Sequence, residues 1–492
     1  MNPIALVFFI VCAVALLAVP RKWAPAVLIL GCTYITMGQG IEVASIHLHI
    51  YRMMLIVGVL RVLMKGEWLK GGVNLIDKML MAWGCWAIFA SLFHEPRYGL
   101  VYTCGAVLNV TMLYFLIRIW CTDLDEIRDV ILIVAFILVP LAAEMLMEKA
   151  TGRNVFAIFG GISEMVPIRE GKLRAQGPFL HSILAGTVGA TCVPLFIGLF
   201  SKSRVAASMG IAAGVVMTFA SASSGPVMSL LAAAGAMMLW PFKQHLSKFR
   251  MCGVIFYFVL MIVMTRPPYY LMGNIDISGG STGWHRANLI EMTFAHLSEW
   301  WIIGTDHTRH WMPAQGIGAD PQHTDITNYF IGLGVQSGLL GMLLVIGVIA
   351  FAFRGAGKVL DDKLESQPEQ GFMIWCFGAS LFSHAVTGLS VSYFDQSILF
   401  FWLTIAVINS TYAVVLLEAR EGVLDETHQP DGEEYALEVA VVEETALVNA
   451  EWRRKCREQI ISAYQARTSA ALSCSRMDKF QSAFNIPPRR VG

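Results

Sequence analysis

Long apolar segments recur along almost the whole chain, separated by polar connections. A helix that crosses a hydrocarbon core needs about 20 mostly apolar residues. The pattern therefore predicts an all-α polytopic integral membrane protein with about 12–13 transmembrane helices, in which the short segments 226–241 and 251–265 could be tilted, kinked or re-entrant. The predicted spans are 3–19, 24–40, 49–65, 75–93, 99–119, 127–147, 182–200, 205–222, 226–241, 251–265, 326–353, 372–391 and 396–417.

Two long polar gaps and a polar tail divide these spans into blocks. We expect N-terminal transmembrane helices in 1–147, a loop in 148–181 and central transmembrane helices in 182–265. A larger loop in 266–325, C-terminal transmembrane helices in 326–417 and a charged tail in 418–492 then follow.

Basic residues in the short connections indicate which side faces the cytoplasm. One set of connections contains nearly all of them, for example Arg21, Lys22, Lys202 and Lys243, whereas the opposing short loops hold only Arg52 and Arg97. Because cytoplasmic loops are enriched in lysine and arginine, we expect both long loops outside the cytoplasm and the tail inside it.

Composition supports a chain that mostly faces lipid. Hydrophobic residues make up 56% and charged residues 15% of the 492 positions, against about 25% charged in soluble domains. The 36 basic and 36 acidic residues balance, so no overall field favours nucleic-acid binding. The ten cysteines occur singly, and we expect neither a disulfide framework nor a cysteine zinc site.

The tail after residue 418 has an acidic first half and a basic second half. This is typical of a solvated, partly disordered regulatory or assembly tail. A basic stretch that docks on anionic lipid is the alternative. No nucleotide-binding glycine loop appears, so ATP-driven pumping has no support in this chain.

The loop 266–325 contains a pattern typical of a helix lying in the membrane interface. Ile290, Phe294, Leu297 and Trp301 recur on one helical face, and tryptophans flank this stripe at 284, 300 and 301. Polar residues follow before the next span. We therefore expect the loop to hold them at the height of lipid headgroups.

The loop 148–181 adds cations on the same side, at 153, 169, 172 and 174. Solvated loop charge is one interpretation, since long loops are exempt from the charge rule. The other is that these cations meet an anion delivered in the membrane plane. Phosphate suits this because a guanidinium can donate two parallel hydrogen bonds to it.

Three motifs follow one another through the two long loops and into the next span. They are RAQGPFLHSILA (174–185), WHRANLIEMTFAHLSEWW (284–301) with Gly316 and Gly318, and HTDITNYFIGLGVQSGLLG (323–341). Together they resemble the bacterial O-antigen ligase and polymerase superfamily, whose members transfer glycans from undecaprenyl-pyrophosphate carriers outside the inner membrane. The first resembles the family's arginine-x-x-glycine-x-phenylalanine stretch, and the second its loop helix with a leading arginine and a following glycine pair. The third resembles its histidine-asparagine segment, which re-enters the membrane and ends in a glycine-rich turn.

The resemblance carries over residue by residue. Arg286 matches the loop arginine that is thought to bind the carrier pyrophosphate, and Asn328 matches the asparagine. The family histidine falls on Thr327, whereas this chain has His323 four residues earlier. A second family arginine, in a serine-arginine-glycine turn, falls on Ser224.

The resemblance implies a GT-C-like fold in the bacterial inner membrane and an inverting glycosyl transfer. Arg286, helped by Arg174 or Arg309, would bind the donor pyrophosphate, with His323 or Asp325 as the base. Asn328, Gly316 and Gly318 would support them. We expect no cofactor and no metal. The expected partners are the lipid-linked glycan, an acceptor glycan or lipid, the bilayer and, through the tail, other polysaccharide-assembly proteins.

Plainer interpretations of these residues stay open. Arg286 could be a helix-start cation that reaches lipid phosphate, and Asp325 could cap the span that begins at 326. His307 and His310 beside Asp306 could bind a metal, but they lack a fixed third ligand.

Two other functions also stay open. One is a protein oligosaccharyltransferase of the same superfamily. The other is a non-catalytic transporter or flippase for a lipid-linked sugar, which would usually place ionisable residues near mid-bilayer.

Overall fold

The computed structural model describes residues 2–43, 46–95, 99–274, 283–313 and 323–427. The chain divides into two compact units, Met1–Leu417 and Glu418–Gly492. Only the first residues of the second unit are described, as the end of helix α15. The first unit is a helical membrane bundle.

All thirteen predicted spans correspond to helices. Five are long and apolar enough to cross a membrane: α5, α6, α13, α15 and the stretch Trp240–Val263 that contains α10. The thirteen helices are α1 (Pro3–Ala18), α2 (Ala24–Tyr34), α3 (Ile50–Lys65), α4 (Leu75–Ser91), α5 (Gly99–Trp120), α6 (Leu124–Thr151), α7 (Ser182–Ile197), α8 (Arg204–Ala220), α9 (Ser224–Met238), α10 (Leu246–Val263), α13 (Tyr329–Ser366), α14 (Pro368–Gly388) and α15 (Ile398–Thr427).

Local sequence explains where several helices begin and end. Asn74 accepts hydrogen bonds at the start of α4 while Asp77 bonds back to the Asn74 amide, forming a capping box. Asp123 caps α6, which ends at Gly152 in a left-handed conformation with φ 72°. These polar caps lie at the ends of apolar stretches, so they set the length of each helix.

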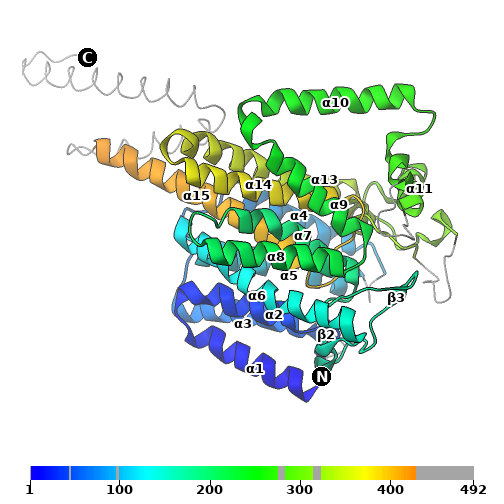
Figure 1. Cartoon of the computed structure of the whole chain (residues 1–492), viewed down its shortest axis with the longest axis horizontal. Coiled ribbons are helices and arrows are strands. Elements are labelled where there is room, and N and C mark those ends of the chain that lie inside the picture. The colour runs from blue at the N-terminus through cyan, green and yellow to red at the C-terminus, as the bar shows by residue number, and fades with distance from the viewer. Residues whose placement is uncertain (1, 44–45, 96–98, 275–282, 314–322, 428–492) are drawn as a thin grey trace, which may run out of the picture. The chain divides into compact units, whose positions relative to one another are not determined.

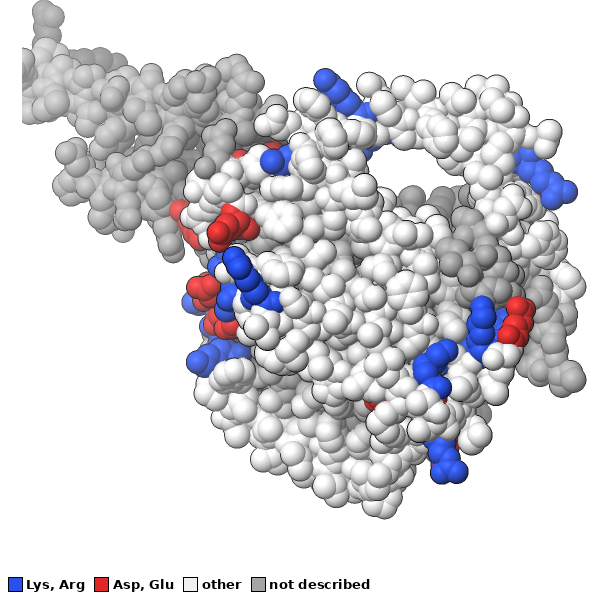
Figure 2. All heavy atoms as spheres, in the orientation of Figure 1, with Lys and Arg blue, Asp and Glu red and all other residues white. Residues whose placement is uncertain are grey.

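The core of the bundle surrounds α7 and α15. Helix α7 packs on α8, α9 and α14. At Gly189 a Cβ atom would come within 2.5 Å of the Gly214 carbonyl oxygen of α8, so glycine permits this close approach. In α15 the residues from Leu399 to Ile408 are almost fully buried. On the face drawn in Figure 2, an uncharged zone of the bundle lies between zones that carry its charged side chains, as expected for lipid contact.

The predicted span 24–40 is only partly helical, which corrects that prediction. Helix α2 has 11 residues, about 16 Å at 1.5 Å per residue, too short to cross a bilayer alone. A hairpin of β1 (Gly40–Val43) and β2 (Ile46–His49) follows. Gly38 packs directly on Gly161, where a Cβ would lie 2.4 Å from the Gly161 Cα, so this segment serves contact with the first loop.

A second hairpin departs from the all-α expectation. Strands β3 (Ile168–Arg169) and β4 (Lys172–Leu173) pair antiparallel within the loop between α6 and α7. A 3-10 turn, η2 (Val155–Phe159), precedes them. These elements order the loop without adding a sheet to the bundle.

Helix α10 is distinct from the rest of the bundle. None of its residues is buried, and Figure 1 shows it away from the other helices, joined to them through η3 (Trp240–His245) and η4 (Pro268–Asn274). Its apolar side chains face outward all round, as on a helix surrounded by lipid.

The larger loop folds into α11 (Gly283–Ala295), α12 (Leu297–Trp300) and η5 (Arg309–Trp311). The predicted apolar stripe is exposed at Phe294 and Trp301, at 66% and 51%. The single predicted helix is broken at His296, however. Trp300 is buried at 3% rather than lying in the interface, because it packs on Gly334 of α13.

Candidate functional site

A small hydrophobic core attaches the larger loop to the start of α13. Its buried members come from α11, α12, η5 and α13, so the described part of the loop is packed rather than extended. They are Leu289, Trp300, Trp311, Met312, Ile331 and Val335. This core gives the neighbouring polar side chains a fixed support.

Helix α13 is kinked where the loop rests on it. Ser337 and Gly338 have non-helical backbone angles, with φ 73° at Gly338. Backbone bonds join the loop to this kink, from the Thr305 amide to the Val335 carbonyl at 2.8 Å and from the Leu339 amide to the Trp301 carbonyl at 2.9 Å. The segment Tyr329–Gln336 is therefore a short half-helix held under the loop.

Arg286 lies near the start of α11 and is mostly enclosed. Within the described residues its guanidinium makes no hydrogen bond, and its Nε atom is buried without a partner. Burial lowers the pKa of Arg286, Asp325 opposes this shift, and Arg169 adds to it. Arg286 thus lies within electrostatic reach of one carboxylate and one second cation.

Arg174 reaches the turn between α8 and α9. Its guanidinium donates to Ser223 Oγ at 2.6 Å, next to Ser224, where the resemblance places a second arginine. The following residue is anchored too, since the Ala175 amide donates to the Ala220 carbonyl at 3.2 Å. Burial, and then Arg169, lowers the pKa of Arg174.

Arg169 and His181 complete what we call the cationic cluster, formed by Arg169, Arg174, His181 and Arg286. His181 caps α7 by accepting from the Ile183 amide at 3.1 Å. Burial, with Arg174 and Arg169 nearby, lowers the pKa of His181 to about 4. His181 is therefore neutral at physiological pH, and the positive charge of the cluster belongs to its three arginines.

The other predicted residues are placed differently. Arg309 donates to the His323 carbonyl at 3.1 Å and to the Met312 carbonyl at 2.6 Å, so it holds loop backbone and has no described contact with Arg286. His323 and Asp325 are exposed, and the Asp325 carbonyl oxygen is bound by His285 at 3.2 Å. The structure thus brings Asp325, but not Arg309, to the cationic cluster.

Asn328 has a structural position. It caps α13 by accepting from the Ile331 amide at 3.1 Å, and its side-chain amide donates to the Leu389 carbonyl at 2.9 Å. The cap of this helix is therefore Asn328, and the alternative that Asp325 caps it is wrong. Gly316 and Gly318 lie outside the described residues.

The suggested group of His307, His310 and Asp306 does not form. Asp306 pairs with His94 of the α4–α5 connection at 2.7 Å. His310 instead contacts Glu299 at 2.9 Å. Together with His296 these two residues could hold a metal ion, a group that the sequence pattern does not predict.

The chain was compared with known proteins. No protein-family model matches it. No curated protein and no solved structure matches it either.

Chemically, the cationic cluster is suited to an anion. Arg174 and Arg286 come from different loops, carry buried Nε atoms without described partners, and share Arg169 as a neighbour. Like charges held together in partly dry surroundings are costly unless an anion compensates them. The sequence pattern did not predict Arg169 and His181 as site residues. Arg169 is placed by the β3–β4 hairpin and His181 by the start of α7.

Proposed function

We propose that the chain is a membrane glycosyltransferase of the O-antigen ligase and polymerase kind. It would move a glycan from an undecaprenyl-pyrophosphate donor to a saccharide or lipid acceptor during surface polysaccharide or exopolysaccharide synthesis. One observation carries the proposal: Arg174 and Arg286, from two loops far apart in sequence, share one cationic neighbour and make no described ion pair.

In this proposal the arginines bind the diphosphate. The acceptor hydroxyl attacks the anomeric carbon while the lipid pyrophosphate leaves from the opposite face, so negative charge develops on the leaving group. A well-placed donor at such a charge is worth about 3–4 kcal/mol. A guanidinium is suited to this because it can donate two parallel hydrogen bonds to a phosphate.

Asp325 is the favoured candidate base in this scheme. It is exposed and lies within electrostatic reach of Arg286, so it can meet an acceptor beside a bound donor. A positioned base typically contributes about 10²–10⁴ in rate. His323, two residues earlier and also exposed, is the second candidate.

The proposed setting is the bacterial inner membrane. About 12–13 crossing helices would place both long loops in the periplasm and the tail in the cytoplasm. The shorter apolar helices, such as α7 with 16 residues, would span about 24 Å and need their flanking turns to reach both surfaces. The uncharged zone in Figure 2 supports this setting.

The two alternatives make different demands. A protein oligosaccharyltransferase would use the same cationic cluster and differ only in the acceptor. A transporter would favour charges near mid-bilayer, and the buried pair Asp77–Arg118 could suggest one. Asp77, however, lies in the first turn of α4 and Arg118 in the last turn of α5, so the pair lies at helix ends.

The test is transfer of glycan from an undecaprenyl-pyrophosphate-linked donor by purified protein in liposomes. Arg286→Ala should reduce the rate about 10²–10³-fold, and Arg286→Lys should restore little because an ammonium cannot reproduce bidentate binding. The matched control is Arg153→Ala, an arginine on the same external loop as Arg174 with a 71% exposed side chain.

Three outcomes separate the hypotheses. Loss of glycan transfer in Arg286→Ala, together with normal transfer in Arg153→Ala, supports the proposal. Normal transfer in Arg286→Ala overturns the assigned site. Movement of the donor across the liposome without bond formation overturns the enzyme in favour of the transporter.

A further inference from the structure

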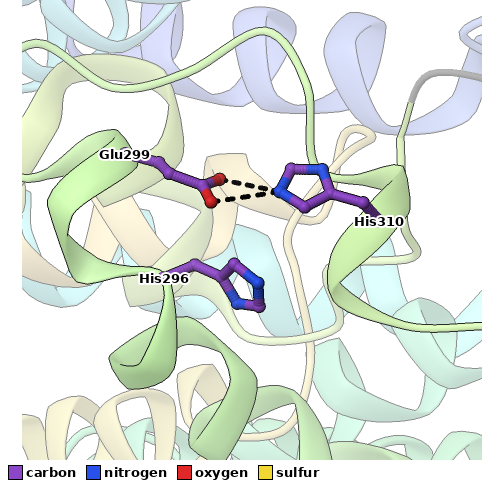
Figure 3. Close-up of side chains that lie close together, drawn as sticks. All are labelled: His296, Glu299 and His310. Atoms are coloured by element: carbon purple, nitrogen blue, oxygen red, sulfur yellow. Dashed lines mark hydrogen bonds and ion pairs between the residues drawn. The ribbon is translucent and has the colours of Figure 1, made fainter.

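His296, Glu299 and His310 meet beside the hydrophobic core of the larger loop (Figure 3). His296 lies between α11 and α12, Glu299 lies in α12, and His310 lies in η5. One ligand atom from each residue lies within 4.8 Å of the others. His310 Nε2 is 2.9 Å from one Glu299 oxygen and 3.1 Å from the other.

The surroundings orient His296 for coordination. Its Nδ1 contacts the Met292 carbonyl at 2.9 Å, and since a carbonyl can only accept, Nδ1 is the protonated nitrogen and Nε2 keeps its lone pair. The ring also stacks on Trp311, with centroids 5.5 Å apart and an interplanar angle of 17°. A backbone carbonyl bound to the distal nitrogen is the usual partner of a metal-binding histidine.

Glu299 is held in place by its hydrogen bonds. The Trp311 indole N–H donates to Glu299 Oε2 at 2.9 Å. Trp311 therefore supports two of the three groups, by stacking on one and by donating to the other.

We propose that His296, Glu299 and His310 bind a divalent cation of the zinc class, with a fourth position open to water. Two imidazoles and one carboxylate are a ligand set that zinc accepts. Ligand atoms around tetrahedral zinc lie about 3.3 Å apart, so small side-chain rotations would complete the geometry. A simple ion pair between His310 and Glu299 would not require the orientation of His296.

The metal would connect α12 to η5 and so stiffen the loop. Arg309 precedes His310 and holds the His323 carbonyl at 3.1 Å, so this connection extends to the segment that leads to Asp325. The role is positional and independent of the proposed glycosyl transfer, in which we expect no metal. Binding can therefore be tested without measuring activity.

The experiment is zinc binding by the purified full-length chain in detergent, carrying an affinity tag without histidines. After dialysis against zinc, elemental analysis should find about one ion per chain. Glu299→Gln, which keeps an acceptor for Trp311, and His310→Ala should each weaken zinc binding at least about 100-fold, beyond the 10–100-fold typical of outer-shell changes. The matched control, His307→Ala, removes an exposed histidine of the same loop and should bind as the wild type does.

A second measurement keeps the test independent of folding defects. Cobalt in place of zinc should give the intense visible absorption of a tetrahedral site in the wild type and in His307→Ala, and lose it in His296→Ala. Equal zinc content in the wild type and in a triple variant of the three ligands would overturn the proposal. Absence of a tetrahedral cobalt band from the wild type would overturn it as well.

Discussion

Two groups of enclosed arginines in the described part of the chain differ in how their positive charge is balanced. At one end of the bundle Arg118 donates to Asp77 at 3.0 Å, and Tyr114 and Asn409 donate to the same carboxylate at 2.6 and 2.8 Å. In the cationic cluster, Arg174 has a serine hydroxyl as its partner, and Arg286 has none among the described residues.

This difference separates a structural network from the candidate binding site. A buried ion pair whose remaining donors and acceptors are satisfied holds α4, α5 and α15 together and offers nothing to a ligand. In the cationic cluster Arg286 has the exposed Asp325 carboxylate within electrostatic reach but no hydrogen-bonded partner among the described residues. Under the proposed function, an anionic ligand would relieve the unfavourable charge that remains. Under the proposed function, arginine therefore serves stability in one place and would serve recognition in the other.

The largest expected effect on stability is at the buried Arg118–Asp77 pair. Arg118→Ala should lower the free energy of unfolding by about 3–5 kcal/mol, because it leaves the Asp77 carboxylate buried without its cation. Thermal unfolding in detergent would measure this. Lys202→Ala, which breaks an ion pair whose side chains are 30% and 43% exposed, is the control and should cost at most about 1 kcal/mol. Equal costs in the two variants would contradict the structural role of the buried Arg118–Asp77 pair.

Sequence patterns predicted the bundle well because lipid imposes a simple requirement on length and apolarity. Thirteen apolar segments formed helices, and the exposed stripe on the loop helix was also anticipated. The prediction of a full span at 24–40 was wrong because hydropathy carries no information on the contact between Gly38 and Gly161. That contact lies beyond the end of the short helix. The break at His296 was missed for a similar reason, since docking of Trp300 on Gly334 decides it.

The candidate site was only partly predictable. Arg174 and Arg286 could be selected because each stands in a motif that resembles one of the O-antigen ligase and polymerase superfamily. That Arg174 reaches Ser223, beside the position where the family arginine is expected, depends on the α8–α9 turn and on the β3–β4 hairpin. The grouping of His296 with His310 depends on the loop core, and nothing in the spacing of 14 residues between them predicts it.

An effect of intermediate size is expected for His181 of the cationic cluster, in the pH dependence of stability. The pKa of His181 is about 4 against an ordinary value of 6.5, so the unfolded chain binds the proton first as pH falls. Its contribution to stability is therefore present above about pH 6.5 and is lost as pH falls toward 4. His181→Asn retains a helix cap that does not titrate. In this variant the midpoint of thermal unfolding should depend less on pH between 6.5 and 4. The control His307→Asn, at an exposed position, should leave the profile as in the wild type, and a steeper profile in His181→Asn would contradict the assignment.

The smallest expected effect is at Asn328, which separates support of the site from the site itself. Asn328→Ala removes the cap of α13 and the bond to Leu389, so the free energy of unfolding should fall by about 1 kcal/mol. Asn328→Asp keeps a cap acceptor but loses the amide donor, and should recover most of that loss. Thermal unfolding measures both variants, and binding of a lipid pyrophosphate measures the cationic cluster, which neither variant touches. If binding fell as far in Asn328→Asp as in Arg286→Ala, Asn328 would belong to the binding site itself. The contrast between a structural network and a separate cationic cluster would then fail for this loop.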